Sequence, residues 1–225
     1  MVVQARMGST RLPKKVLMEV VEGYSILGYL LKRLSSGKQA DKIIVATTTN
    51  NKDDELEEWV KDSGYHYFRG SEADCLDRFY QVIERYGIDI VVRITSDCPL
   101  IIPEVVDEMI KYYLNNSTKI DYLSNRQFTN FPEGMDVEIF SREILEDAAR
   151  NAAKQKEREH INYFFLDRPS QYRIRYYNHN LGVDYSRFKL SVDTHQELEQ
   201  IRSFFKEKGL PFQFTFKELI NVLIK

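Results

Sequence analysis

Residues 89–100, DIVVRITSDCPL, decide the fold class of this 225-residue chain. The run over residues 89–94 is rich in β-branched side chains, which is typical of a central strand in a parallel sheet. A polar turn follows at residues 95–97, and Pro103 then favours the start of a helix over residues 104–114. This stretch therefore predicts a buried strand, a polar turn and a helix in succession.

Strands and helices alternate in the same way toward the N-terminus. The expected elements are a short strand at residues 2–3, a helix at 25–34, a strand at 41–49, a helix from Asn51 to Gly64, a strand at 65–68 and a helix at 75–86. This alternation predicts an α/β protein with a doubly wound, mostly parallel sheet. Ligands bind beyond the carboxyl ends of the strands in such sheets. Three polar strand ends, at residues 4–15, 47–49 and 95–97, are therefore expected at one edge.

The pattern changes in the second half of the chain. The expected elements there are a strand at residues 134–140, helices at 142–153 and 156–166, a strand-like segment at 171–178 and a short strand at 187–192. Thr194 with Glu197, and Thr215 with Glu218, form capping boxes that predict the last two helices. No repeat, low-complexity tract or linker interrupts the sequence, so residues 1–225 are predicted to form one domain.

Composition excludes several classes of protein. The net charge of −2 argues against broad nucleic-acid or anionic-membrane binding, although a local basic loop suffices for a small anion. The sequence holds no run of about 18 apolar residues, so no membrane span is predicted, and the N-terminus lacks the pattern of a signal peptide. The two cysteines, Cys75 and Cys98, have no metal-like spacing and are expected to be reduced thiols of a cytoplasmic protein.

The N-terminal stretch QARMGSTRLPKKVL, residues 4–17, is the strongest functional candidate. The four cations of this stretch, which holds no acid, are Arg6, Arg11, Lys14 and Lys15. Small side chains at residues 8–10 let backbone N–H groups approach a ligand closely. Fixed N–H dipoles and forked guanidinium donors together predict a polyphosphate cradle. The alternative is a solvated basic turn, which would not need small residues and a proline so close together.

Two aspartates follow predicted strands and are candidates for metal binding. Asp97 comes just after a buried strand, and a charge there must be hydrated, paired or bound to a metal. Asp193 also follows a predicted strand and precedes a helix. Thr194 already fits the cap of that helix, which leaves the Asp193 side chain free. Mg²⁺ prefers one or two carboxylates together with phosphate oxygens, so it is the expected partner beside a phosphate cradle. The alternative is a helix-capping role, which is weaker for Asp97 because its helix begins well downstream.

Four further side chains are candidates for a substrate pocket: Asp136, Glu138, Arg158 and His160. Asp136 and Glu138 share one face of the strand at residues 134–140. A solvated or dimer-facing edge is an equal alternative for that face. Arg158 and His160 belong to the segment EREH and place a cation and an imidazole together, although a lone histidine is more often structural.

At QARMGSTRLPKKVL the sequence resembles the cytidylyltransferases that activate sugar acids, such as the 3-deoxy-manno-octulosonate and acylneuraminate cytidylyltransferases. The resemblance is closest to the spore coat polysaccharide biosynthesis protein F group and spans essentially the whole chain. The other supporting segments are IIVATTTN (43–50), FRGSEADCLDRF (68–79), VVRITSDCPLI (91–101), EGMDVEIF (133–140), EREH (157–160) and SVDT (191–194). Two departures are Lys14 and Ser96, which stand where glycine is frequent.

The resemblance implies a three-layer α/β/α sandwich with a Rossmann-like sheet of the nucleotide-diphosphosugar transferase type. The residues that it implies for binding CTP are Ala5, Arg6, Gly8, Ser9, Arg11, Lys15, Thr47, Thr48, Ser71 and Arg78. Arg6, Lys15 and Asp97 would be the catalytic residues, and Asp97 and Asp193 would hold Mg²⁺. Residues 120–140 would lie beside a sugar pocket and a homodimer interface.

The resulting hypothesis is a Mg²⁺-dependent cytidylyltransferase that joins CTP and a sugar acid, or a related sugar, for surface polysaccharide biosynthesis. The products would be a CMP-sugar and pyrophosphate. Two alternatives are a glycosyltransferase of the same fold that uses a nucleotide sugar, and a non-catalytic protein with a vestigial nucleotide site. A glycosyltransferase would need a metal-binding pair of acids on one loop, whereas Asp97 is the single close candidate after a strand.

Overall fold

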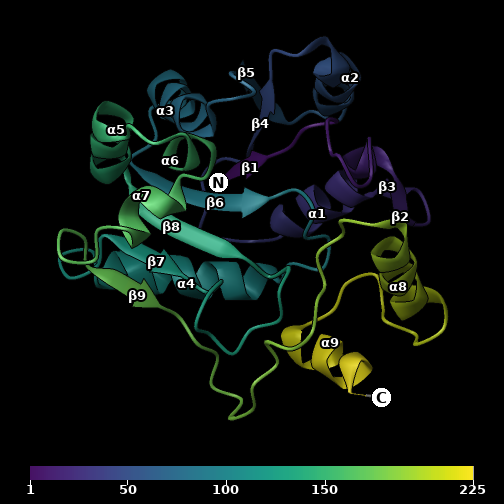
Figure 1. The fold of residues 1–225 in the computed structure, drawn as a ribbon. Helices are drawn as coiled ribbons and strands as arrows, with labels where there is room; N and C mark the ends of the chain where they lie inside the picture. Colours follow the sequence, from purple (N-terminus) through teal and green to yellow (C-terminus); the bar gives the residue numbers. More distant parts are fainter. Residues whose placement is uncertain (225) are drawn as a thin grey trace.

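The structure, a computed structural model that describes residues 1–224, is organised around one seven-stranded sheet (Figure 1). Its strands are β1 (Val2–Gln4), β4 (Ile44–Thr48), β5 (His66–Gly70), β6 (Ile90–Thr95), β7 (Tyr122–Ser124), β8 (Val137–Ser141) and β9 (Ile174–Tyr176). Their order is β5-β4-β1-β6-β8-β7-β9, and β8 is antiparallel to both neighbours while the other pairs are parallel. The predicted mostly parallel α/β sheet is thus confirmed. A separate hairpin pairs β2 (Glu19–Val21) with β3 (Tyr24–Ser25).

Helices cover both faces of the sheet, which gives the three expected layers (Figure 1). One face carries α1 (Ile26–Leu34), α2 (Asp54–Asp62), α4 (Pro103–Asn115), α8 (His195–Lys206) and α9 (Phe216–Leu223). The other carries α3 (Cys75–Tyr86), α5 (Arg142–Asn151), α6 (Gln155–Glu159) and α7 (Asn162–Leu166). A hydrophobic core lies on each face of the sheet, and successive strand residues point into opposite cores. Val3 and Val45 pack on the face that carries α1, and Val2 and Ile44 pack on the face that carries α3.

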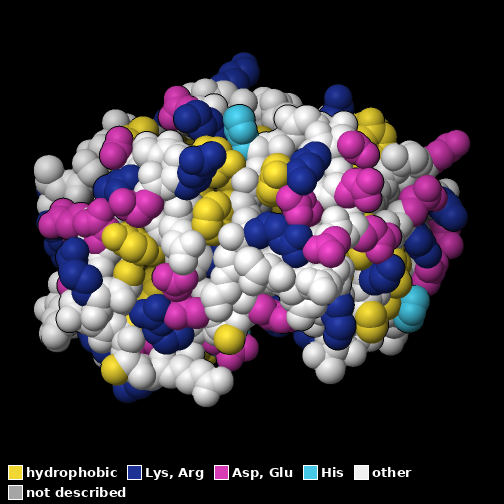
Figure 2. Space-filling model, turned by 90° about the horizontal axis from the view of Figure 1, so that it is seen from above, with side chains coloured by type: hydrophobic (Ala, Val, Ile, Leu, Met, Phe, Trp, Pro, Cys, Tyr) yellow, Lys and Arg dark blue, Asp and Glu magenta, His cyan; other side chains and the backbone are white. Residues whose placement is uncertain are grey.

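The face of the molecule drawn in Figure 2 carries charges of both signs. Figure 2 shows Lys and Arg side chains interspersed with Asp and Glu over the face seen from above, rather than gathered in one basic patch. A basic patch or stripe is the usual footprint of a nucleic-acid interface. No helix within residues 1–224 is long and apolar enough to cross a membrane.

Local capping signals place several helix starts where the sequence predicts them. Asp74 caps α3 by accepting a hydrogen bond from the backbone N of Asp77. The capping boxes that begin at Thr194 and Thr215 are both formed. The residue before α4 is Ile102, so the Asp97 side chain is not its cap and is available for another role.

The helix predicted over residues 156–166 is instead two short helices, α6 and α7. His160 leaves the helical conformation between them, with φ −128° and ψ 93°. The turn brings Arg168 back to the buried carboxylate of Glu157, with 2.8 Å between Arg168 Nη1 and Glu157 Oε1. In one continuous helix these side chains would lie about three turns apart, so the ion pair requires the break.

The strand predicted over residues 187–192 is instead an extended segment that an isolated β-bridge joins to Glu133. Its backbone pairs with two loops, since Leu190 N donates to Glu133 O at 2.7 Å and Val192 N donates to Asp97 O at 2.8 Å. The segment therefore ties the turn before β8 to the loop after β6.

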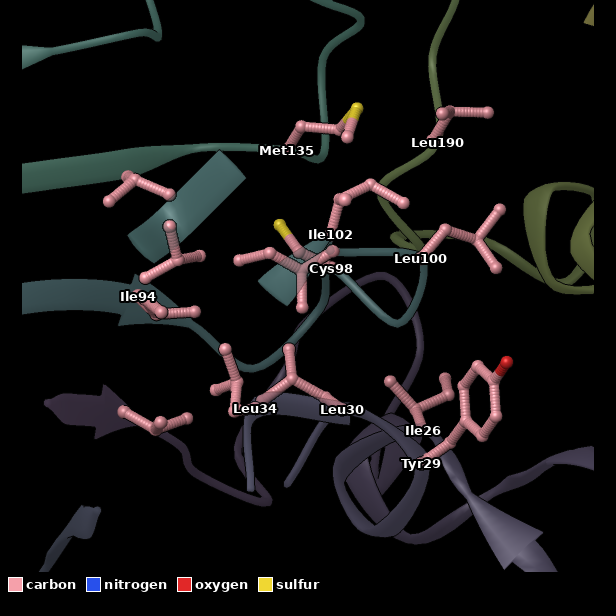
Figure 3. Packing of buried hydrophobic residues seen from close by; sticks show 14 of the residues in the cluster. Ile26, Tyr29, Leu30, Leu34, Ile94, Cys98, Leu100, Ile102, Met135 and Leu190 are labelled. Carbon is pink, nitrogen blue, oxygen red and sulfur yellow. The ribbon is translucent and has the colours of Figure 1, made fainter. Parts of the chain in front are cut away.

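The loop after β6 is anchored in the hydrophobic core. Cys98 and Leu100 are buried and lie opposite Leu30 and Leu34 of α1 (Figure 3). Cys98 is a free thiol, as is Cys75, which agrees with the expectation for both. Because its neighbour is fixed in the core, the Asp97 carboxylate is held at the edge of the sheet.

Gly134 allows the turn before β8 to approach residues 190–191. Its φ is +95°, and a Cβ atom there would collide with the backbone of Leu190 and Ser191. Gly182 also has a positive φ, +71°, but its Cβ would meet open space.

We expect Gly134→Ala to lower the free energy of unfolding by about 1–3 kcal/mol more than Gly182→Ala, because only the former adds a collision to backbone strain. Urea unfolding of the two variants measures this difference. Equal losses would show that the close approach of residues 133–134 to 190–191 does not support the fold.

Candidate functional site

A cleft of about 430 Å³ opens at the carboxyl ends of β1 and β6. This is the edge at which doubly wound sheets bind their ligands. The cations that line it are Arg6, Arg11, Lys15, Arg78, Arg93 and Arg126. The acids that line it are Glu72, Asp97, Glu133, Asp136, Glu159 and Asp193. Such a lining suits a polyanionic ligand that is accompanied by a cation.

Lys15 joins three segments of the chain at the floor of this cleft. Its Nζ donates to Asp97 Oδ2 at 3.0 Å, to Asp193 Oδ1 at 2.9 Å and to the carbonyl oxygen of Val192 at 2.7 Å. Arg11 adds a second cation, with Nη2 2.9 Å from Asp193 Oδ2. The structure therefore brings the cationic turn and the two distant aspartates together, as the sequence predicts.

Asp97 and Asp193 form a donor set that fits Mg²⁺. Both carboxylates reach one ammonium group, so a single small cation could contact both. Within residues 1–224 there is no cluster of three or more His, Cys, Asp or Glu side chains with metal-site geometry. A pair of carboxylates is nevertheless sufficient for Mg²⁺, which takes its other oxygens from phosphates and water.

Two carboxyl groups of the cleft differ in their protonation. Partial burial acts to raise the pKa of Asp193, but the hydrogen bond and charge of Lys15, with Lys189, hold this pKa below its ordinary value. Burial raises the pKa of Asp136 to about 6, opposed by Arg126 and assisted by the charge of Asp97. Asp193 is therefore ionised at neutral pH, whereas Asp136 changes its charge just below neutrality.

Asp53, which is 2% exposed, anchors the cationic turn through hydrogen bonds. Its Oδ1 accepts from the backbone N of Met7 at 2.7 Å, and its Oδ2 accepts from the backbone N and the hydroxyl of Thr48. These donors satisfy the buried carboxylate and fix the turn to the end of β4. In the sequence, Asp53 lies near the start of the helix expected from Asn51, and no pattern distinguishes it from neighbouring Asp54.

Most of the predicted nucleotide and metal residues line the cleft, namely Ala5, Arg6, Ser9, Arg11, Lys15, Arg78, Asp97 and Asp193. Gly8, Thr47, Thr48 and Ser71 are not among the described residues that line it. Thr47 and Thr48 are fully buried, and Asp53 holds the Thr48 hydroxyl. The Ser71 hydroxyl accepts from the backbone N of Asp74 at 3.1 Å. The expectation that the Thr47 and Thr48 side chains face a ligand is therefore corrected, whereas Ser71 and Gly8 stay predictions.

Two candidates for the substrate pocket, Asp136 and His160, do line the cleft. Asp136 Oδ2 lies 3.6 Å from Arg126 Nε. His160 reaches the cleft because the chain turns between α6 and α7. Burial lowers the pKa of His160, and the nearby charges of Arg93 and Arg126 act in the same direction. Its imidazole is therefore neutral at pH 7.

The other two candidates, Glu138 and Arg158, are not among the described residues that line the cleft. Glu138 is 3% exposed, and its carboxylate pairs with Arg93 and accepts from the hydroxyl of Tyr122. Arg158 is turned toward the start of α3, with Nε 2.7 Å from Asp74 Oδ2. Both predictions are corrected, because these side chains already have partners inside the protein.

Arg93 and Arg126 are lining residues that sequence reasoning missed. Arg93 is detectable as one cation inside an otherwise apolar strand, which indicates a buried partner or a site. Arg126 lies in an irregular segment and carries no such signal.

Two residues of the turn have unusual backbone surroundings. Lys14 adopts a left-handed conformation, with φ 60° and ψ 14°, which is the conformation that glycine adopts without steric cost. Its ammonium pairs at the surface with Glu55, at 2.6 Å. Gly8 lies beside the cleft, where a Cβ atom would come within 3.3 Å of the Glu72 carboxylate.

We expect Lys14→Gly to be more stable than Lys14→Ala by about 1 kcal/mol. Both variants lose the pair with Glu55, and only the glycine relieves the left-handed backbone. Chemical denaturation of the two proteins measures the difference. An alanine variant as stable as the glycine variant would show that the backbone at this position is not strained.

Asp136→Asn tests the raised pKa of this carboxyl group. Because its pKa is about 6 in the folded protein and 3.8 ordinarily, the folded state binds the proton more tightly than the unfolded chain between these values. Relative to Asp136→Asn, the wild type should lose stability as the pH rises from about 4 to about 6, and the loss should persist above that.

At pH 8 the variant should therefore be the more stable protein by about 1–3 kcal/mol, and the two should converge near pH 4. Urea unfolding of both proteins across this pH range measures the difference between their free energies of unfolding. The other titrating groups are common to both proteins, so their effects cancel in this difference. A difference that did not vary with pH would contradict the assignment.

Comparison with known proteins agrees with this geometry. Residues 1–220 match the protein family described as Cytidylyltransferase. The chain is 31% identical to the spore coat polysaccharide biosynthesis protein SpsF of Bacillus subtilis, over 99% of this chain and 92% of that protein. The solved structure of a cytidylyltransferase from Leptospira borgpetersenii superposes with a TM-score of 0.92 at 35% identity, covering 99% of this chain and 92% of that one.

A more distant structure shares the fold alone. It is a CMP:2-keto-3-deoxy-manno-octonic acid synthetase complexed with CTP, with a TM-score of 0.69 at 16% identity, covering 92% of this chain and 98% of that one. The fold of this chain is therefore shared with that structure, and its sequence matches one family over residues 1–220. The chain belongs to the cytidylyltransferase family.

Proposed function

We propose that this chain transfers CMP from CTP to an oxygen atom of a sugar acid or a related sugar and releases pyrophosphate. The observation that carries the proposal is the convergence of Lys15, Asp97 and Asp193 beside the cationic turn. Family membership supports CTP as the nucleotide.

The relatives support the substrate class. The name of the Bacillus subtilis protein refers to spore coat polysaccharide biosynthesis. Several curated proteins that match about half of this chain are named as 3-deoxy-manno-octulosonate cytidylyltransferases. We therefore infer that the activated sugar is used to build a surface polysaccharide.

The reaction requires positioning more than covalent protein chemistry. The acceptor oxygen forms a bond to the α-phosphorus of CTP, the bond from that phosphorus to pyrophosphate breaks, and the acceptor proton passes to water. Arg6, Arg11 and Lys15 would hold the triphosphate and would stabilise the charge that develops on the leaving pyrophosphate. Gly8 and Ser9 leave room for backbone N–H groups near the phosphates. Orientation and electrostatics then supply most of the rate.

Asp97 and Asp193 are the residues that would hold Mg²⁺. The ion, when bound, orients the phosphates and neutralises part of their charge. The carbonyl oxygen of Val192 lies beside both carboxylates, since all three accept from the Lys15 ammonium. An oxygen-only donor set of this kind suits Mg²⁺.

The assembly and location are part of the proposal. Residues 120–140 are proposed to contribute both to the sugar pocket and to a homodimer interface. Asp136 of this segment lines the cleft, and Phe128 of the same segment is 83% exposed. The enzyme is proposed to act in the cytoplasm, where CTP is available.

We expect Asp97→Ala to reduce pyrophosphate release from CTP by about a hundredfold or more, because it removes a carboxylate placed at the triphosphate. Asp89→Ala is the matched control, since Asp89 lies at the opposite end of β6 and its side chain is 94% exposed. The assay screens four nucleoside triphosphates against sugar acids and aldoses, with and without Mg²⁺.

Unchanged release in Asp97→Ala would overturn the metal assignment. Transfer from a preformed nucleotide sugar, without pyrophosphate formation from CTP, would instead identify a glycosyltransferase. A thermal shift by CTP and Mg²⁺ without pyrophosphate release for any acceptor would identify a non-catalytic nucleotide-binding protein.

A further inference from the structure

A row of polar side chains crosses four neighbouring strands on the face of the sheet that α3 covers. The Tyr122 hydroxyl on β7 donates to Glu138 on β8, and Glu138 pairs with Arg93 on β6. Arg93 Nε then donates to Gln4 Oε1 on β1 at 3.0 Å. The row therefore runs from the interior of the sheet to a residue that lines the cleft.

This row is costly to bury. Arg93 and Glu138 are 4% and 3% exposed, and the hydrophobic cluster on this face includes Phe140 and Phe165. A buried ion pair is often no more stabilising than apolar residues of the same volume. Stability alone therefore does not account for the row, and two of its members, Arg93 and Gln4, line the cleft.

The row fixes the orientation of the Gln4 amide. A guanidinium Nε–H can only donate, so the amide oxygen of Gln4 must face Arg93. The thiol of Cys75, the first residue of α3, approaches the same oxygen at 3.6 Å. The two amide N–H donors of Gln4 have no hydrogen-bond partner within residues 1–224, and the residue lines the cleft. Gln4 thus presents donors to a ligand and no acceptor.

We propose that Gln4 is a specificity-determining residue that reads the acceptor edge of the pyrimidine base. This inference rests on the proposed function, in which the cleft binds CTP. Gln4 directly precedes the turn assigned to the phosphates, and it contacts α3 beside Arg78, another lining residue. The base is therefore placed between the end of β1 and the start of α3.

Cytosine and uracil differ at the atoms that such a donor would meet. Cytosine offers two adjacent acceptors there, the ring N3 and the O2 oxygen, whereas uracil carries a proton on N3. An amide held with its donors outward therefore favours cytosine. A correct hydrogen bond to a base discriminates by about tenfold or more against a base that cannot form it.

Gln4→Glu and Gln4→Met test the proposal by calorimetric binding of CTP and UTP with Mg²⁺, which requires no acceptor sugar. The wild type should prefer CTP. In Gln4→Glu the side chain offers only acceptors to the N3 and O2 acceptors of cytosine, so the ratio of CTP to UTP affinity should fall by about tenfold or more. Gln4→Met keeps the length of the side chain without its donors and should bring the ratio near one.

Binding of inorganic triphosphate should be retained in both variants, since the turn is intact, and it reports that the cleft is folded. A CTP to UTP ratio that stays at the wild-type value would overturn the role of Gln4 and leave the proposed function standing. A wild-type protein that binds no nucleotide would overturn both.

Glu138→Gln provides a second route that does not alter Gln4. It weakens the hold on Arg93 and should lower the CTP to UTP ratio with little effect on triphosphate binding. An unchanged ratio in Glu138→Gln would overturn the positioning role of the row.

Discussion

The site depends on one ammonium group that neutralises two carboxylates. Lys15 Nζ lies within 3.0 Å of both Asp97 and Asp193, and its side chain is 9% exposed. Two carboxylates so close together would otherwise repel each other and favour separation of their loops. The backbone bond from Val192 N to Asp97 O holds the two loops together independently of charge. The edge of the sheet is thus both charged and rigid, which is what binding a polyphosphate with a cation requires.

The sequence predicts this convergence because each participant is marked by its local context. Lys15 belongs to an acid-free cationic stretch, Asp97 follows an apolar strand, and Asp193 precedes a residue that already caps a helix. Parallel strands bring their carboxyl ends to one edge, so the alternation of elements is enough to place the first two residues together. The fold class follows from the same alternation, since β1 and β6 pair in parallel at the centre of the sheet.

The errors arise where a contact between distant residues overrides the local pattern. The pair of Glu157 with Arg168 divides a predicted helix and delivers His160 to the cleft. The pair of Glu138 with Arg93 withdraws a predicted substrate residue into the interior. Asp53 anchors the cationic turn because it accepts a hydrogen bond from the backbone N of Met7, 46 residues earlier in the chain. None of these partners is encoded by spacing along the chain, so periodicity and capping signals cannot find them.

Among the described residues, some cations of the cleft form ion pairs with carboxylates of the protein, and others do not. Lys15 and Arg126 each pair with lining carboxylates. Arg78, in contrast, forms no ion pair within residues 1–224, and its Nε is buried there without a hydrogen-bond partner.

A buried donor left unpaired costs about 1–3 kcal/mol, which a ligand that pairs with it recovers. Gln4 offers amide donors where the end of β1 meets the start of α3, whereas Lys15 with Asp97 and Asp193 offers both signs of charge. A nucleotide base that presents acceptors suits Gln4. Phosphates with their cation suit Lys15 and the two aspartates.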